Sequence, residues 1–192
     1  MSDVLILASS SPQRARLLEG IGVEFEVIPS AVDEDGHGER DPEKRAQVLA
    51  KLKAQDIAKD HPDRWVLGAD TLVVSEKGTL LEKPANEDEA RAMLREQSDA
   101  TSIVHSAVCL IAPDGKISEG IDTSSVHFRP LSAEDIGWWM STNLWQGRSG
   151  GFQIDGPGQL MIERIEGDWS GIVGLPIFLF GRLASRAGLR IN

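Results

Sequence analysis

The chain has 192 residues, of which 41% are hydrophobic and 26% are charged, and its formal net charge is −10 at pH 7. This length and composition predict one globular domain over residues 1–192 with a buried core. The acidic balance argues against a nucleic-acid polymer or an anionic membrane surface as the main partner, although a local basic pocket can still bind a small anion.

The first predicted element is a buried strand. Residues 4–8 form a short, continuous apolar run, which is typical of a strand covered on both faces. The first residues lack the basic region of a signal peptide, and no stretch approaches the ~18 apolar residues that a membrane-spanning helix needs. We therefore expect a cytoplasmic protein.

The following residues predict a helix, a second strand and an acidic loop. The helix begins at Pro12 and ends at Gly20 or Gly22. Residues 24–28 alternate as a strand does, and the acidic stretch DEDGHGERD over 33–41 is expected to be a loop.

The rest of the chain mixes helices with hairpins. In chain order we expect a helix over 42–59, a strand over 65–74 (or two strands broken near Gly68), a helix over 86–97, strands over 102–112 and 117–128 around the turn Asp114-Gly115, a helix over 132–140, a glycine-rich loop around a short strand over 148–158, a strand over 159–165, a turn over 167–171 and a helix over 176–187. This pattern predicts an α/β fold in which a mixed, twisted sheet has flanking helices.

The only cysteine, Cys109, lies in the apolar run SAVCLIA. A single cysteine excludes an internal disulfide and a zinc site built from cysteines. Its apolar setting favours a buried structural thiol over a nucleophile.

The segment ASSSPQR at 8–14 places three serines and an arginine at the start of the first predicted helix. The backbone N–H groups of a helix N-terminus bind phosphate readily, and the guanidinium of Arg14 suits phosphate oxygens. The simpler alternative is that one serine caps the helix and that Arg14 is solvated. The segment alone favours this alternative.

Lys53 lies within an apolar stripe of the helix over 42–59, together with Ala46, Leu49 and Ile57, whereas Lys51 lies on the opposite face. Burying an unpaired charge is costly. Lys53 therefore either extends to solvent or points into a cleft that holds an anion, and the sequence does not favour one over the other.

Carboxylates follow two of the predicted strands. Asp70, in GADT, is expected where a strand ends, and Asp33, Glu34 and Asp35 follow the strand over 24–28. Carboxylates that converge suit a hard cation such as Mg²⁺, although an isolated aspartate often only caps a turn. The four histidines lack the spacing of zinc ligands.

Lys83, in LEKP, precedes a predicted helix, and Asp155 and Asp168 lie among glycines that let a backbone approach a ligand. Tight turns explain those glycines equally well. No Cys–His or Ser–His pairing is evident. The combined set of basic groups and carboxylates favours metal-assisted attack of water on a phosphoanhydride over acyl transfer.

These motifs resemble those of the Maf-type nucleoside triphosphate pyrophosphatases in order and spacing, from near the N-terminus to residue 176. The resemblance is carried by ASSSPQR (8–14), AVDE (31–34), LAKLKA (49–54), GADT (68–71), LEKP (81–84), GGFQIDG (150–156) and GDWSGIVGLP (167–176).

The resemblance implies two lobes around a central cleft, as in the related inosine triphosphate pyrophosphatases, and hydrolysis of a nucleoside triphosphate to the monophosphate and pyrophosphate. It implies a divalent metal, Mg²⁺ or Mn²⁺, as cofactor. By matching position, Asp70 would be the base that activates water. The triphosphate would be held by Ser9, Arg14, Lys53 and Lys83, and the metal by Glu34, with Asp33 and Asp70 as further candidates.

The resemblance also points to three substrate-specificity positions, which here are Gln13, Thr71 and Asp155. The dTTP/UTP type carries Arg, Thr and Gln at these positions, and the 7-methyl-GTP type carries an aromatic residue, Gln and Glu. Only Thr71 matches the first type, whereas Asp155 is chemically nearer to the second. Gln153 is a further candidate for reading the base.

Two other functions compete with the pyrophosphatase. The chain could be a nucleotide-binding regulator of cell division without turnover, or a phosphatase that releases orthophosphate. Family members are often dimers, and we expect Trp138, Trp139 and Trp145 to be candidates for a homodimer surface, although at least one of them could pack under its own helix.

Overall fold

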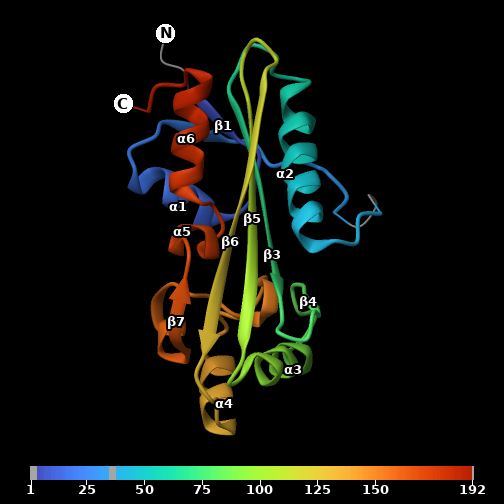
Figure 1. The fold of residues 1–192 in the computed structure, drawn as a ribbon, viewed down its shortest axis with the longest axis vertical. Helices are drawn as coiled ribbons and strands as arrows, with labels where there is room; N and C mark the ends of the chain where they lie inside the picture. Colours follow the sequence, from blue (N-terminus) through green and yellow to red (C-terminus); the bar gives the residue numbers. More distant parts are fainter. Residues whose placement is uncertain (1–3, 35–37, 192) are drawn as a thin grey trace.

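The computed structural model describes residues 4–34 and 38–191, and within them the strands form one mixed sheet of seven strands (Figure 1). The order along the sheet is β2-β1-β3-β5-β6-β7, and β4 pairs with β3. β1 runs parallel to β2 and β3, whereas the remaining pairs are antiparallel. The strands are β1 (Leu5–Leu7), β2 (Phe25–Val27), β3 (Val66–Val74), β4 (Leu80–Leu81), β5 (Thr101–Ile111), β6 (Ile117–Phe128) and β7 (Ile162–Glu166).

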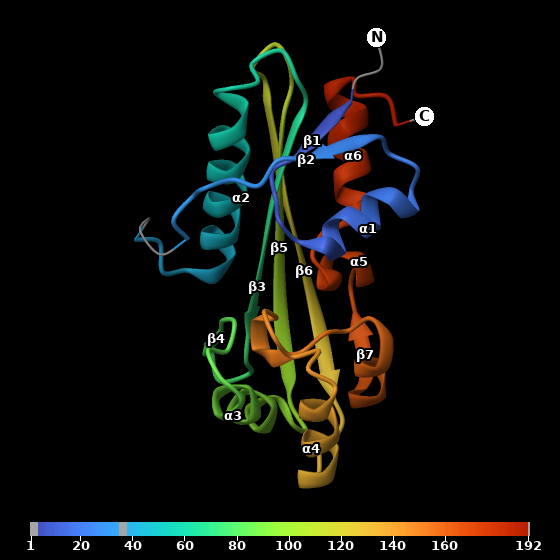
Figure 2. The same cartoon turned by 180° about the vertical axis from the view of Figure 1, so that it is seen from behind.

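Helices flank this sheet on both faces, so the predicted mixed α/β fold is confirmed (Figure 2). They are α1 (Pro12–Gly20), α2 (Pro42–Ala58), α3 (Glu87–Gln97), α4 (Ala133–Ser141), α5 (Trp169–Val173) and α6 (Ile177–Ala187), with short 3-10 helices η1 (Ser149–Gly151) and η2 (Gly156–Met161). Two of these helices begin at capping residues, as predicted. The Asn86 side chain accepts a hydrogen bond from the Glu89 backbone N–H at the start of α3, and Ser132 forms a capping box with Asp135 at the start of α4.

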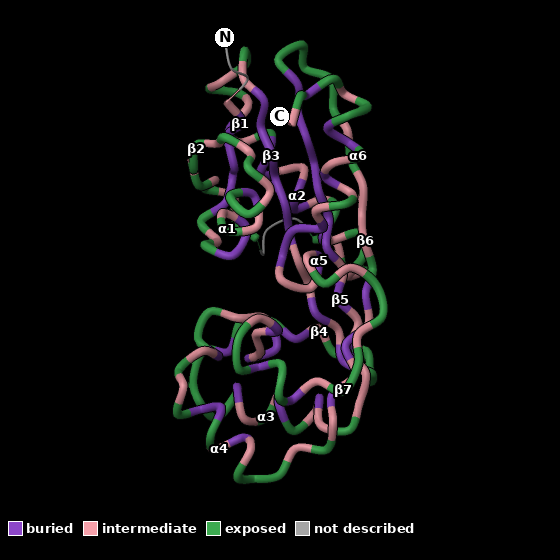
Figure 3. The backbone as a smooth tube through the Cα atoms, turned by 90° about the vertical axis from the view of Figure 1, so that its left-hand side faces the viewer, coloured by how far each residue is buried: buried purple, intermediate pink, exposed green. Residues whose placement is uncertain are grey.

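One half of the molecule, here called the first lobe, has three layers. α1 and α6 cover one face of the sheet, and their core includes Leu18, Leu67 and Phe180. α2 covers the other face, where Ala50 and Ala54 pack against Ile6 and Cys109. The buried parts of β1 and β3 run through this half (Figure 3).

The other half, the second lobe, contains α3, α4, β4, β7, η1 and η2 around the far ends of β3, β5 and β6. Its core is separate and is centred on the fully buried Trp139, which packs with Leu94, Phe128 and Met161. β3 and β5 contribute buried residues to the cores of both lobes, and β6 contributes Val126 and Phe128 to the second core and the partly buried Ile121 to the first. These strands therefore join the two halves.

β3 is continuous through Gly68, so the alternative of two strands broken there is wrong. A Cβ atom at Gly68 would lie 2.2 Å from the Ala50 carbonyl oxygen of α2. The glycine therefore allows α2 to approach the strand closely, and it does not end the strand.

Three local predictions are wrong, and one strand was missed. The segment 148–158 contains no strand but forms η1 and the start of η2. The last strand begins at Ile162 rather than 159, the segment around 169 is the helix α5 rather than a turn, and β4 was not predicted. Glycines explain the first difference, because Gly150 and Gly151 have φ of 72° and 63°, which no strand residue adopts.

The three tryptophans proposed for a dimer surface differ in exposure. Trp138 is 37% exposed, but Trp139 and Trp145 are only 0% and 8% exposed because they belong to the core of the second lobe. Two of the three therefore cannot form a surface. No helix in the described part of the chain is long and apolar enough to span a membrane.

Candidate active site

A cavity of about 520 Å³ lies between the two lobes and is lined by residues of both. The first lobe contributes the start of α1 and the inner face of α2, and the second lobe contributes the segment after β4 and the loop around η1. The cavity brings together most of the side chains selected from the sequence: Ser9, Gln13, Arg14, Glu34, Lys53, Asp70, Thr71, Lys83, Gln153 and Asp155.

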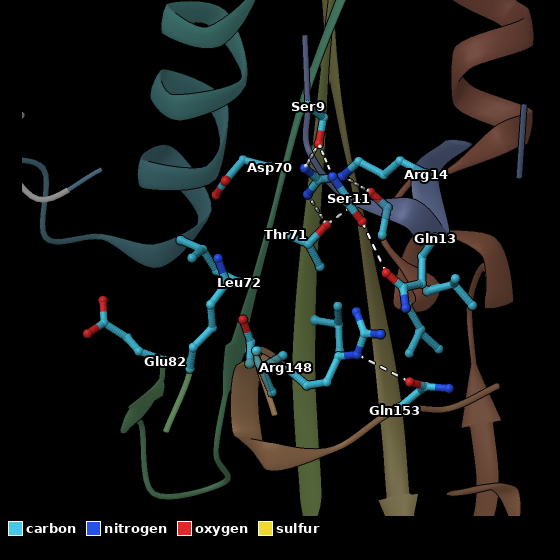
Figure 4. Close-up of a pocket in the computed structure, with 18 of the residues that line it drawn as sticks. Ser9, Ser11, Gln13, Arg14, Asp70, Thr71, Leu72, Glu82, Arg148 and Gln153 are labelled. Atoms are coloured by element: carbon cyan, nitrogen blue, oxygen red, sulfur yellow. Dashed lines mark hydrogen bonds between the residues drawn. The ribbon is translucent and has the colours of Figure 1, made fainter. Parts of the chain in front are cut away.

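Arg14 is buried at the start of α1, and all three of its guanidinium nitrogens donate hydrogen bonds (Figure 4). Nε donates to the Gly174 carbonyl at 2.8 Å, Nη1 to Ser9 Oγ at 2.9 Å and Nη2 to Thr71 Oγ1 at 3.4 Å. These acceptors are neutral, so they orient the guanidinium without neutralising it.

The serines do not cap α1 through their side chains. Ser11 occupies the N-cap position but makes no side-chain cap hydrogen bond. Its hydroxyl donates to Gln13 Oε1 at 3.3 Å, and its backbone N–H donates to Ser9 Oγ at 3.2 Å. The first turn of α1 therefore faces the cavity without a side-chain cap, as a site for an anion requires.

Lys53 points into the cavity from α2 and does not extend to solvent. Lys53 is only 6% exposed. Its Nζ atom contacts Asp70 Oδ1 at 2.6 Å and Glu34 Oε1 at 2.8 Å. The second of the two alternatives for Lys53, a cleft-facing charge, therefore holds. Lys51, on the opposite face of α2, pairs with Glu119 at 3.1 Å.

Asp70 lies within β3, between Val66 and Val74, rather than at a strand end as the sequence suggested. The strand continues because it pairs with β5 along its whole length, with Asp70 opposite Ala107. Asp70 is 4% exposed and extends from β3 into the cavity (Figure 4). Its Oδ2 atom is buried and has no hydrogen-bond partner among the described residues.

Burial and neighbouring charges in the cavity shift the pKa values of Glu34 and Arg14. Burial raises the pKa of Glu34, but the hydrogen bond from Lys53 and the charges of Lys53, Lys83 and Arg14 outweigh it, so that the pKa lies below its usual value. Burial lowers the pKa of Arg14, while the charges of Asp70 and Glu34 oppose this effect. Arginine nevertheless stays protonated in proteins.

The oxygen donors at this point of the cavity suit a hard divalent cation. Asp70 offers a buried oxygen without a partner, and the Glu34 carboxylate shares Lys53 with it. Asp33 is exposed and does not line the cavity, and Asp35 lies outside the described residues. Within those residues, no group of three or more His, Cys, Asp or Glu side chains is close enough to hold a metal alone. A cation would therefore need oxygen atoms of the substrate phosphates as further ligands.

The second lobe supplies a different set of polar groups. Lys83 is exposed at the edge of the cavity. Arg148 Nε donates to Gln153 Oε1 at 3.2 Å, and Gln153 Nε2 donates to the Asp155 carbonyl at 3.3 Å. Figure 4 shows Asp70 and Glu82 on one side of the cavity, Gln13 and Gln153 on the other, and Arg148 between them.

Two other selected residues have structural partners. Thr71 Oγ1 donates to the Gly174 carbonyl at 3.2 Å and accepts from Ser106 Oγ at 3.1 Å, so it holds the same carbonyl that orients Arg14. Asp168 caps α5, because its Oδ1 accepts from the Ser170 and Gly171 backbone N–H groups. The turn-capping alternative therefore accounts for Asp168.

Sequence reasoning missed Arg45, Glu82 and Arg148, all of which line the cavity. Arg45 contacts Glu82 Oε1 at 3.1 Å, which links α2 to the second lobe. A signal for Arg45 was present, since Arg45, Leu49 and Lys53 follow one another at four-residue spacing. The positions of Glu82 and Arg148 depend on tertiary packing and had no local signal.

Comparison with known proteins gives consistent matches. The family model of Maf-like proteins matches residues 4–187. The chain is 45% identical to a dTTP/UTP pyrophosphatase of Deinococcus radiodurans, over 96% of this chain and 93% of that protein. It is 42% identical to a dTTP/UTP pyrophosphatase of Pyrococcus furiosus, over 93% of each chain.

Among solved structures, a HAM1 protein from Coxiella burnetii matches 99% of this chain and 100% of its own, with a TM-score of 0.50 and 13% identity. At this identity the likeness concerns the fold alone. It agrees with the fold class expected from the sequence.

Proposed function

The chain belongs to the Maf family of nucleoside triphosphate pyrophosphatases, and from this premise we propose that its cavity binds dTTP or UTP and that Asp70 activates the attacking water. The products of this hydrolysis are the nucleoside monophosphate and pyrophosphate. The observation that supports the role of Asp70 best is its buried Oδ2 atom, which has no hydrogen-bond partner in the described part of the chain.

The phosphates would bind at the basic end of the cavity. Arg14 is oriented by three neutral acceptors and keeps its charge for a phosphate oxygen. Ser9 and the uncapped first turn of α1 lie beside it. Lys53 and Lys83 would hold phosphate from α2 and from the opposite lobe, so that binding brings both lobes into contact with one ligand.

Asp70 would act as general base through Oδ2. Its other oxygen is fixed by Lys53 at 2.6 Å, which holds the carboxylate in one orientation. A water oxygen attacks the α-phosphorus, Oδ2 accepts the proton that the water loses, and the bond between the α-phosphorus and the bridging oxygen breaks to release pyrophosphate. An ordinary aspartate is a weak base at neutral pH, so the surrounding positive charges must also acidify the water.

The divalent metal expected from the resemblance, Mg²⁺ or Mn²⁺, would be held by Glu34 together with phosphate oxygens. Asp70 would be a ligand only in place of its role as base, because Oδ2, its one oxygen without a partner among the described residues, cannot serve both. When bound, the metal would polarise the phosphates and lower the pKa of the attacking water. Asp33 is a weaker candidate because it does not line the cavity.

The specificity positions divide between two roles. Gln13 and Asp155 line the cavity and can reach a bound nucleotide. Thr71 is engaged with Arg14, Ser106 and Gly174, so we propose that it affects the substrate by fixing Arg14 rather than by contacting the base.

The test is a nucleotide panel with separate detection of pyrophosphate and phosphate, in the presence of Mg²⁺ or Mn²⁺. We expect pyrophosphate from dTTP and UTP, and a loss of at least about a hundredfold in kcat in Asp70→Asn. The matched control is Asp63→Asn, which changes an exposed carboxylate away from the cavity and should leave kcat unchanged.

Other outcomes identify the competing functions. Orthophosphate without pyrophosphate would indicate a phosphatase. Tight triphosphate binding without turnover would indicate the nucleotide-binding regulator of cell division. Full activity in Asp70→Asn would show that the base is misassigned. The homodimer and the cytoplasmic location stay predictions from the sequence, and sedimentation of the purified protein measures the first of them.

A further inference from the structure

Ser106 is a buried polar residue that lies next to the site but does not line the cavity. It belongs to β5 and is only 1% exposed. Its hydroxyl has one proton, which it shares between the Gly171 carbonyl at 2.6 Å and Thr71 Oγ1 at 3.1 Å. Both acceptors belong to segments that hold Arg14.

The pairing of β3 with β5 places Ser106 beside Thr71. The two residues are directly opposite each other in the antiparallel register, so their side chains lie on the same face of the sheet. Thr71 Oγ1 in turn accepts from Arg14 Nη2 at 3.4 Å and donates to the Gly174 carbonyl at 3.2 Å. Ser106 is therefore one hydrogen bond away from a group that orients Arg14.

Ser106 also holds the end of α5, where a second acceptor of Arg14 lies. The last carbonyls of a helix lack partners within the helix. The Gly171 carbonyl of α5 accepts from Ser106, and the Gly174 carbonyl directly after α5 accepts from Arg14 Nε at 2.8 Å. The start of α5 is held separately, by the cap from Asp168. The position of the Gly174 carbonyl therefore depends on Ser106.

We infer that Ser106 is a positioning residue for phosphate binding, because it holds Thr71 and the end of α5 where they fix the guanidinium of Arg14. It does so without a contact to the substrate. The third acceptor of Arg14, Ser9 Oγ, lies in the same loop as Arg14 and does not depend on Ser106. This inference rests on the proposed function, in which Arg14 holds the triphosphate.

The direction of the guanidinium matters because its donors form a rigid planar fork. A fork that faces a phosphate can donate two parallel hydrogen bonds, and a rotated one cannot. The charges of Asp70 and Glu34 already act on Arg14. If Thr71 and α5 were free to move, these carboxylates would draw the guanidinium away from the phosphates.

The test is a double-mutant cycle with Arg14, read by the binding of inorganic tripolyphosphate in the presence of Mg²⁺. This probe has no base, so it reports on the phosphate contacts alone. Ser106→Ala should raise its dissociation constant by about tenfold, because hydrogen bonds between charged groups are weakened. In an Arg14→Met background the same substitution should change the constant by less than about twofold, because no guanidinium remains to be positioned.

Ser75→Ala is the matched control. Ser75 is also buried, accepts from the Thr79 N–H at 3.2 Å and does not line the cavity. Its loss should lower the unfolding temperature and leave tripolyphosphate binding unchanged. Thermal unfolding checks each variant, and Ser106→Cys, whose thiol is a weak donor, takes the place of Ser106→Ala if the latter does not fold.

Two results would overturn the inference. Equal losses of binding in the wild-type and Arg14→Met backgrounds would show that Ser106 supports the fold in general rather than Arg14. Unchanged binding in Ser106→Ala would show that Arg14 keeps its direction without the hydroxyl.

Pyrophosphate release from the nucleotide panel separates this inference from the proposed function. If no nucleotide yields pyrophosphate but tripolyphosphate binds and shows the expected cycle, the positioning role stands and the hydrolytic function fails. If pyrophosphate is released but the losses are equal in both backgrounds, the hydrolytic function stands and the positioning role fails. If tripolyphosphate does not bind to the wild type, the positioning role fails whatever the panel yields.

Discussion

Lys53 is a buried charge held between two carboxylates. It lies on the inner face of α2 with Asp70 and Glu34 as its partners, and Asp70 is slightly more buried than Lys53 itself. The sequence predicted that Lys53 lay in an apolar stripe, because helical periodicity is a local property. It also selected Asp70 and Glu34 as candidate site residues, but it could not predict that these carboxylates from other segments contact Lys53, because that contact depends on tertiary packing.

Removal of Lys53 should therefore destabilise the fold as well as the site. In Lys53→Met we expect the free energy of unfolding to fall by about 3–5 kcal/mol, because Asp70 is left buried without its cation. The double variant Lys53→Met/Asp70→Asn should recover part of this loss. Urea unfolding measures both, and a single variant as stable as the wild type would contradict the argument.

Cys109 shows the opposite case, in which the local sequence was sufficient. The thiol is buried between α2 and the sheet, as its apolar neighbours predicted. Burial, followed by the charge of Glu119, raises its pKa to about 12. In the unfolded chain a thiol ionises near pH 8.5–9.

Between about pH 9 and 12 the unfolded chain therefore binds fewer protons at Cys109 than the folded chain, and stability must fall as the pH rises. By about pH 10.5 we expect a loss of about 2 kcal/mol that is absent in Cys109→Ala. Urea midpoints of the two proteins across this range give the difference. The chain has no tyrosine, whose ionisation would overlap with that of the thiol. If the urea midpoints of the wild type and Cys109→Ala fall in parallel as the pH rises, the thiol is not the cause of the loss.

At the scale of elements, the close contact between α2 and β3 determines where Lys53 and Asp70 meet. Gly68 permits this contact, since the Ala50 carbonyl and the Ala54 N–H of α2 occupy the space that a side chain would need. From the sequence alone, a glycine in a strand suggested a break, because the chain does not reveal which backbone will lie against it.

Gly68→Ala should consequently cost at least about 2 kcal/mol of unfolding free energy, because α2 must move away from the sheet. Gly137→Ala is the control: Gly137 lies in α4 with no atom near its missing Cβ, and alanine there should be neutral or stabilising by up to about 1 kcal/mol. Thermal or urea unfolding tests both changes. Equal stability of the two variants would refute the role given to Gly68.

Elements with strong periodicity or caps were predicted well, and those held by tertiary contacts were not. α2, α3, α4 and the hairpin of β5 and β6 agree closely with the sequence pattern. η1, by contrast, is held by Glu82, Gln97 and Trp139 from outside the segment. No local pattern encodes such partners, and the second-lobe side of the cavity, with Glu82 and Arg148, was for that reason the least predictable part.

At the scale of the whole molecule, the two lobes have separate cores but share strands. β3, β5 and β6 extend from one core into the other without a linker. The sequence predicted the mixed sheet, and the family resemblance implied the two lobes. The length of the shared strands could be read only from the structure.

Because the same strands serve both cores, we expect the lobes to unfold together, so that residues 1–192 behave as one cooperative unit. In calorimetry the measured enthalpy should equal the van't Hoff enthalpy. Two resolved transitions, or an early loss of the near-ultraviolet signal from the tryptophans of the second lobe, would show instead that the lobes are independent.

The contacts of Lys53 with Asp70 and Glu34 also bear on how the reaction ends. In the cavity without a ligand, Lys53 already has two anionic partners. A triphosphate carries enough charge to replace Glu34 while Asp70 keeps its contact with Lys53, whereas the single phosphate of the monophosphate competes with Glu34 poorly. Product inhibition by the monophosphate should accordingly be weak, since Glu34 returns to Lys53 once pyrophosphate has left.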